Sequence, residues 1–103
     1  MIPLVEQNRS QLVDLCRRYF VRRLDVFGSA TRVTQFDAEK SDLDFLVEFL
    51  ETDAMNPADQ YFGLLEELER LFGRRVDLVS ARSLRNPYFI KSVEATREAL
   101  YAA

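Results

Sequence analysis

The chain has 103 residues and a net charge of −3, and it is 48% hydrophobic and 30% charged, values typical of one small water-soluble domain. It contains no histidine, which excludes Ser-His-Asp and Cys-His catalysis and nearly every transition-metal site. Carboxylates, hydroxyls and arginine remain for chemistry, a set suited to hard cations such as magnesium. The acidic balance argues against direct binding of a long nucleic acid, which calls for a basic face.

Three further features bear on location. No run of about 18 apolar residues exists, so no membrane span is predicted. The first six residues lack the basic and then apolar layout of a signal peptide. The single cysteine, Cys16, cannot form an internal disulfide, which favours the reducing cytoplasm. Because no repeat or linker interrupts the chain, we expect one cytoplasmic domain over residues 1–103.

The predicted elements begin with a helix that runs to about residue 20. Its apolar residues recur at helical spacing: Val5, Leu12, Leu15, Cys16 and Tyr19. Residues 24–27 are a short strand candidate that ends at Gly28. The polar residues 31–41 are expected to form a loop, and the apolar, partly alternating residues 43–49 predict a second, well-buried strand.

A longer helix is predicted to begin at Asn56-Pro57, a capping residue followed by proline, and to end at Gly73. Its apolar stripe comprises Tyr61, Leu64, Leu65, Leu68, Leu71 and Phe72. Residues 75–79 predict a third strand. A final amphipathic helix is marked by Phe89, Ile90, Val93 and Leu100. This order predicts the α/β or α+β class, with a small mixed β-sheet flanked by helices.

Two carboxylates, Asp42 and Asp44, open the second predicted strand. Residues i and i+2 of a strand point to the same face, with Cα atoms about 6.6 Å apart. Carboxylates at that spacing can converge on one magnesium ion or bridge two ions roughly 4 Å apart. An isolated Asp-x-Asp is more often a simple polar strand end, so the metal-binding interpretation depends on further residues.

Two other features support that interpretation. Gly28 and Ser29 follow the preceding strand; glycine lets backbone amides approach a phosphate, and serine adds a hydroxyl donor. Asp77 lies within the apolar third strand, where a carboxylate is costly unless it is paired or metal-bound. A salt bridge to Arg74 or Arg75 is the alternative for Asp77. Together these residues are the parts required for metal-assisted phosphoryl or nucleotidyl transfer.

Residues 28–32 (Gly-Ser-Ala-Thr-Arg), residues 41–44 (Ser-Asp-Leu-Asp) and Asp77 closely resemble the pattern of the polymerase-beta-like nucleotidyltransferases. The short length, Arg32 and residues 98–101 (Glu-Ala-Leu-Tyr) are most similar to the minimal nucleotidyltransferases, or MNT proteins, which are usually the antitoxins of HEPN–MNT toxin–antitoxin pairs. One residue departs from the family. Val33 stands where glycine is common, and its β-branched side chain disfavours positive φ, which implies a different path for the loop after Arg32.

The resemblance implies a role for each motif residue. The nucleotide-binding residues would be Gly28, Ser29, Arg32 and Ser41. Asp42, Asp44 and Asp77 would be the catalytic and metal-binding residues. The first two would ligate both of two magnesium ions, for which manganese can substitute. Asp77 would complete the second metal site and help deprotonate the acceptor hydroxyl.

The function implied by the resemblance is that of the antitoxin of a type VII-like HEPN–MNT pair. Such a protein would transfer AMP from ATP to a tyrosine hydroxyl of the cognate HEPN ribonuclease toxin, with which it would form a hetero-oligomer. The short chain leaves few residues to grip an acceptor, which favours a partner that presents one. Two alternatives are a non-catalytic antitoxin that neutralises by binding and a small-molecule nucleotidyltransferase. The intact carboxylate triad argues against the first, and the lack of an added substrate domain argues against the second.

Overall fold

The computed structural model describes residues 1–31 and 42–103. In chain order the elements are α1 (Pro3–Gln7), α2 (Arg9–Arg18), β1 (Val21–Phe27), the short 3-10 helix η1 (Gly28–Thr31), β2 (Leu43–Phe49), α3 (Pro57–Phe72), β3 (Val76–Ser80), the short 3-10 helix η2 (Ala81–Ser83), α4 (Pro87–Thr96) and β4 (Glu98–Ala102). Among these described helices, none has the length and apolar character that crossing a membrane requires.

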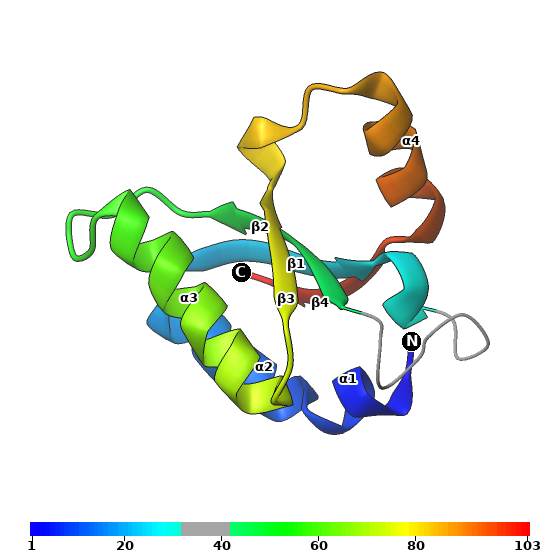
Figure 1. Ribbon diagram of the computed structural model, residues 1–103. Coiled ribbons are helices and arrows are strands. Elements are labelled where there is room, and N and C mark those ends of the chain that lie inside the picture. Colours follow the sequence, from blue (N-terminus) through cyan, green and yellow to red (C-terminus); the bar gives the residue numbers. More distant parts are fainter. Residues whose placement is uncertain (32–41) are drawn as a thin grey trace.

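The strands form a mixed sheet in the order β3-β2-β1-β4 (Figure 1). β1 pairs antiparallel with both β2 and β4, whereas β2 and β3 run parallel. The parallel pair arises because α3 crosses over between the two strands, as parallel pairing requires. The predicted fold class, a small mixed sheet flanked by helices, is confirmed.

The two faces of the sheet are covered differently. α2 and α3 lie on one face, where Leu12 and Leu64 pack with Phe45 in the main core (Figure 1). α4 lies over part of the other face, where Val93 packs in a smaller cluster with Leu46. Because side chains alternate along a strand, β2 contributes apolar residues to the first face and carries Asp44 on the second.

Capping residues define α3 as predicted. The Asn56 side chain accepts a hydrogen bond from the Asp59 amide at 2.8 Å, and Pro57 is the first helical residue. Gly73 ends the helix in the left-handed conformation, with φ +62°. By contrast, the single helix expected up to about residue 20 is wrong, because the chain breaks at Asn8 into α1 and α2. There the Asn8 side chain donates to the Leu4 carbonyl at 2.8 Å and competes with the helical pattern.

The last element differs most from the sequence-based prediction. The final helix ends at Thr96, and Leu100 belongs to β4 instead of to that helix. Arg97 leaves the helical region with ψ 138°, and the chain then pairs with the edge of β1. This pairing satisfies backbone groups that β1 would otherwise expose to solvent. Tyr101, in this strand, packs against the main core. β1 also begins earlier than predicted, at Val21.

Candidate active site

The turn after β1 brings its backbone against a carboxylate of β2. Phe27, the last residue of β1, is the register partner of Asp44. The next residue, Gly28, has φ +71°, and a Cβ atom at this position would lie 2.7 Å from Asp44 Oδ2. Both the left-handed backbone and the lack of space require glycine here. The structure therefore joins the predicted Gly-Ser turn to the predicted carboxylate pair.

Hydrogen bonds fix the conformation of this turn. Its residues, Gly28–Thr31, form the short 3-10 helix η1. The Gly28 amide donates to Thr96 Oγ1 at 2.9 Å, and Thr31 Oγ1 donates to the Gly28 carbonyl at 2.8 Å. The Ala30 carbonyl accepts from the Ile2 amide at 3.0 Å. The turn is thus tied both to the N-terminal segment and to the end of α4.

The carboxylates lie on the sheet face that α2 and α3 leave uncovered. Asp44 and Asp77 are direct register partners in the parallel β2–β3 pair, so their side chains lie side by side. Neighbouring strands are about 4.8 Å apart. Asp42 immediately precedes β2, and its charge acts on the Asp44 carboxylate.

The three carboxylates differ in burial. Asp44 is half-buried, whereas Asp42 and Asp77 are exposed. The expectation that Asp77 is enclosed in an apolar strand is wrong, because β3 is an edge strand and alternates buried and exposed positions there. Asp77 therefore does not need a partner to offset desolvation, and its carboxylate is accessible to a ligand.

Negative charge accumulates at Asp44. The pKa of Asp44 is raised from 3.8 to about 6, mainly by burial and then by the charges of the nearby Asp77 and Asp42 carboxylates. The pKa of the Tyr61 hydroxyl is also raised, by burial and then by the charge of Asp77. A bound cation would relieve this repulsion, so the electrostatics of the site favour a positively charged ligand.

The donor set fits magnesium that shares its coordination with a substrate. Within residues 1–31 and 42–103, no three acidic or cysteine side chains form a complete metal-binding cluster. Magnesium typically uses one or two protein carboxylates and takes its other ligands from water and substrate phosphates. Asp42, Asp44 and Asp77 suit magnesium bound in this way, with its remaining ligands from water and substrate phosphates. Arg32 and Ser41, also predicted to bind the nucleotide, lie outside the described residues.

Sequence reasoning missed a buried ion pair beside this site. Asp25, in β1, is only 1% exposed, and Arg97 Nε donates to its Oδ2 at 2.8 Å. Arg23 Nε donates to Asp25 Oδ1 at 3.2 Å. The available signal was a carboxylate inside an apolar strand, the same signal that drew attention to Asp77.

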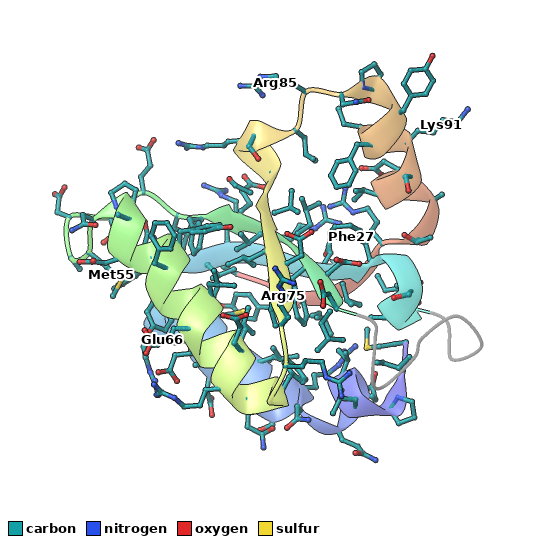
Figure 2. All side chains as sticks on the ribbon, in the orientation of Figure 1. Phe27, Met55, Glu66, Arg75, Arg85 and Lys91 are labelled. Carbon is teal, nitrogen blue, oxygen red and sulfur yellow. The ribbon has the colours of Figure 1, made fainter. Side chains whose placement is uncertain are left out.

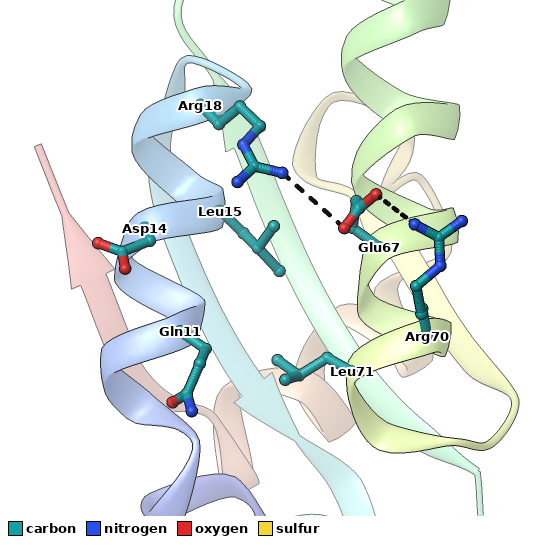
Figure 3. Close-up of a pocket in the computed structure, with 7 residues that line it drawn as sticks. All are labelled: Gln11, Asp14, Leu15, Arg18, Glu67, Arg70 and Leu71. Atoms are coloured by element: carbon teal, nitrogen blue, oxygen red, sulfur yellow. Dashed lines mark hydrogen bonds and ion pairs between the residues drawn. The ribbon is translucent and has the colours of Figure 1, made fainter.

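A pocket between α2 and α3 lies on the opposite face of the sheet from the carboxylates (Figure 3). Its lining residues are Gln11, Asp14, Leu15, Arg18, Glu67, Arg70 and Leu71. Glu67 forms ion pairs with Arg70, at an N–O distance of 3.0 Å, and with Arg18, at 3.9 Å. Because these charges already pair with one another, the pocket adds nothing to the chemistry of the site.

Two named proteins are similar to this chain in sequence. It is 40% identical over 77 residues to a Methanocaldococcus jannaschii protein provisionally named a protein adenylyltransferase, a match that covers 75% of this chain and 74% of the relative. It is 41% identical over 73 residues to the protein adenylyltransferase MntA of Thermococcus cleftensis, covering 71% of this chain and 69% of that protein.

Solved structures share the fold. One that is provisionally described as a minimal nucleotidyltransferase has a TM-score of 0.74 and 33% identity, and the match covers 94% of this chain and 95% of that one. A chain in the complex of tri-AMPylated Shewanella oneidensis HEPN toxin with MNT antitoxin has a TM-score of 0.64 at 20% identity, covering 95% of this chain and 72% of that one. This second likeness shows the fold alone. The family described as polymerase beta, nucleotidyltransferase matches residues 10–103, and the chain belongs to it.

Proposed function

We propose that this protein is a magnesium-dependent protein adenylyltransferase. It transfers AMP from ATP to a tyrosine hydroxyl of a HEPN-domain toxin and so acts as the antitoxin of a toxin–antitoxin pair in the cytoplasm, with residues 1–103 as one catalytic domain. The observation that carries the proposal is the contact between the Gly28 turn and Asp44, beside Asp77. This close approach supports a site in which a turn that would bind phosphate lies against a carboxylate that would bind metal.

Each site residue has a role in this reaction. Asp42, Asp44 and Asp77 would hold magnesium, which stabilises negative charge on the attacking and leaving oxygens when it is bound. Gly28 provides the space next to Asp44, and Ser29 would donate to the nucleotide phosphates. Because Asp77 is exposed at the edge of the sheet, its carboxylate can accept the proton of an incoming hydroxyl.

The reaction balances without any further reactant. The acceptor hydroxyl oxygen forms a bond to the α-phosphorus of ATP while its proton passes to a carboxylate. The bond from that phosphorus to the bridging oxygen breaks, and pyrophosphate leaves with the electron pair. The products are the AMP-modified protein and pyrophosphate.

The first turn of α4 offers a surface for the protein partner. Tyr88 is 85% exposed and Phe89 39% exposed. Figure 2 shows Arg85 in the loop before α4 and Lys91 on the helix, pointing to opposite sides; the Arg85 guanidinium donates to the Arg82 carbonyl at 2.7 Å. Phe89 also contacts Phe27, the register partner of Asp44, edge to face, with ring centroids 6.0 Å apart. A partner bound to this aromatic first turn of α4 would therefore lie near Phe27 and the carboxylates beside it.

Relatives support both the activity and the partner. The two sequence relatives are named protein adenylyltransferases. The HEPN toxin in the solved Shewanella oneidensis complex is AMP-modified and bound to an MNT antitoxin.

Labelled ATP tests the proposal directly. The chain is incubated with magnesium, ATP labelled at the α-phosphate and the proposed cognate HEPN-domain toxin, and the label on the toxin is measured. We expect transfer by the wild type and by Asp53→Asn, a change in an exposed segment far from the site, and a loss of transfer in Asp42→Asn. Neutralisation of the toxin without label would instead establish an antitoxin that acts by binding alone.

A further inference from the structure

The hydroxyl group of Thr96 connects the end of α4 to the nucleotide turn. Thr96 is the last residue of α4, and its Oγ1 accepts the Gly28 amide at 2.9 Å. The same hydroxyl donates its own hydrogen to the Ser92 carbonyl one turn earlier, at 3.3 Å. Since the hydrogen points back along the helix, a lone pair of Oγ1 faces the Gly28 amide. The orientation of the hydroxyl is thus set by the helix itself.

This contact changes what Gly28 can do. Its amide hydrogen is already bonded within the protein, so Gly28 serves the site through its left-handed φ and its lack of a side chain beside Asp44. Contacts to a phosphate must then come from Ser29 and the following part of the turn. The position of Ser29 relative to Asp44 depends on how firmly Gly28 is held.

A buried ion pair holds Thr96 in place. The next residue, Arg97, donates through Nε to Asp25 Oδ2 at 2.8 Å, and Asp25 lies in β1, two residues before Phe27. Arg97 also donates to Glu94 of α4. β1 and the end of α4 are therefore linked twice, once through Arg97 and Asp25 and once through Thr96 and Gly28. The two links start from successive residues, Thr96 at the end of α4 and Arg97 at its C-cap. Together they hold the end of α4 rigidly against β1.

We propose that Thr96 is a positioning residue for nucleotide binding. Its hydroxyl holds the Gly28 amide so that Ser29 faces the phosphates at a fixed distance from Asp44. Thr96 acts through Gly28 and contacts no reacting atom. This inference rests on the nucleotide-binding part of the proposed function and does not depend on the identity of the acceptor.

Three variants isolate the hydroxyl group. Thr96→Val keeps the branched shape and removes the acceptor, whereas Thr96→Ser keeps the acceptor. Ser92→Ala is a matched control on the same helix, because Thr96 bonds only the backbone carbonyl of Ser92. ATP affinity with magnesium is measured by calorimetry, the kcat and KM of AMP transfer are measured with the partner, and thermal unfolding checks the fold.

We expect Thr96→Val to weaken ATP binding and raise the KM for ATP roughly tenfold, the scale of one hydrogen bond. Its kcat should change much less, and both Thr96→Ser and Ser92→Ala should stay within about twofold of the wild type in ATP affinity. The Gly28 amide should exchange with solvent faster in Thr96→Val than in the wild type, a readout that is independent of the nucleotide.

If the wild type binds ATP, either of two results would overturn the inference. One is a folded Thr96→Val protein with wild-type ATP affinity; the other is a Thr96→Ser protein that loses as much affinity as Thr96→Val. If the wild type binds no ATP, both this inference and the proposed function fail. If it binds ATP and Thr96→Val does not, while no partner is labelled, only the acceptor assignment fails.

Discussion

Replacing Asp44 by asparagine should stabilise the metal-free protein while abolishing its activity. The folded state raises the pKa of Asp44 from 3.8 to about 6, first through burial and then through the Asp77 and Asp42 charges. At about pH 8 the carboxylate is ionised in both the folded and the unfolded states, and only the folded state bears this cost. The asparagine side chain would occupy nearly the same volume as the aspartate without carrying a charge.

The size of the effect follows from the pKa change. A rise from 3.8 to about 6 corresponds to at most about 3 kcal/mol. Because Asp44 is only half-buried and water screens its charge, we expect about 1 kcal/mol of the free energy of unfolding. For a domain of this size, that amounts to an increase of about 4–8 °C in Tm.

The pKa change also sets the direction in which the stability of the protein depends on pH. Since the folded pKa is raised, protonation of Asp44 stabilises the wild type as pH falls from about 6 towards 3.8, and this contribution is lost as pH rises through about 6. The advantage of Asp44→Asn should therefore be full at about pH 8 and should shrink towards about pH 4. Magnesium with ATP should reverse the ranking, because only the wild type gains stability from binding them.

Thermal unfolding in a metal-chelating buffer, with and without added magnesium and ATP, measures these differences. Asp53→Asn is the matched control, because it removes one negative charge from an exposed segment. The reasoning is refuted if Asp44→Asn is no more stable than the wild type at about pH 8. It is also refuted if Asp53→Asn gains as much stability, since that would indicate a general effect of net charge.

Three other changes test separate parts of the molecule. Gly28→Ala should abolish AMP transfer, since its methyl group would lie 2.7 Å from Asp44 Oδ2 at φ +71°; transfer assays would show this, and near-wild-type transfer would mean that the turn can move. Arg97→Met should lower the free energy of unfolding by about 3 kcal/mol in urea denaturation, because it leaves the buried Asp25 without its main partner; an unchanged midpoint would contradict that role. Tyr88→Ser should slow transfer to the partner at least about tenfold, as expected for an aromatic anchor, while calorimetry shows unchanged ATP affinity; equal loss of both would place Tyr88 outside the partner surface.

Short sequence patterns were enough to predict several elements of this protein and its family. The alternation from Leu43 to Phe49 predicted a buried strand with Asp44 on the face opposite Phe45, because side-chain direction along a strand depends on spacing. Asn56, Pro57 and Gly73 set both ends of α3, because capping depends on neighbouring backbone groups. The Gly-Ser, Asp-x-Asp and Asp pattern was enough to identify the family that the comparisons confirm.

Only the tertiary structure decided how distant segments meet. The order β3-β2-β1-β4 makes Asp44 and Asp77 direct neighbours and exposes Asp77 at an edge, and no local pattern encodes strand order. Leu100 matched the spacing of the last predicted helix, but pairing with β1 drew residues 98–102 into a strand. The Thr96–Gly28 and Arg97–Asp25 contacts join residues 68 and 72 positions apart. Such contacts form only when folding brings α4 against the end of β1, so the sequence alone could supply the reactive groups while the fold sets their positions.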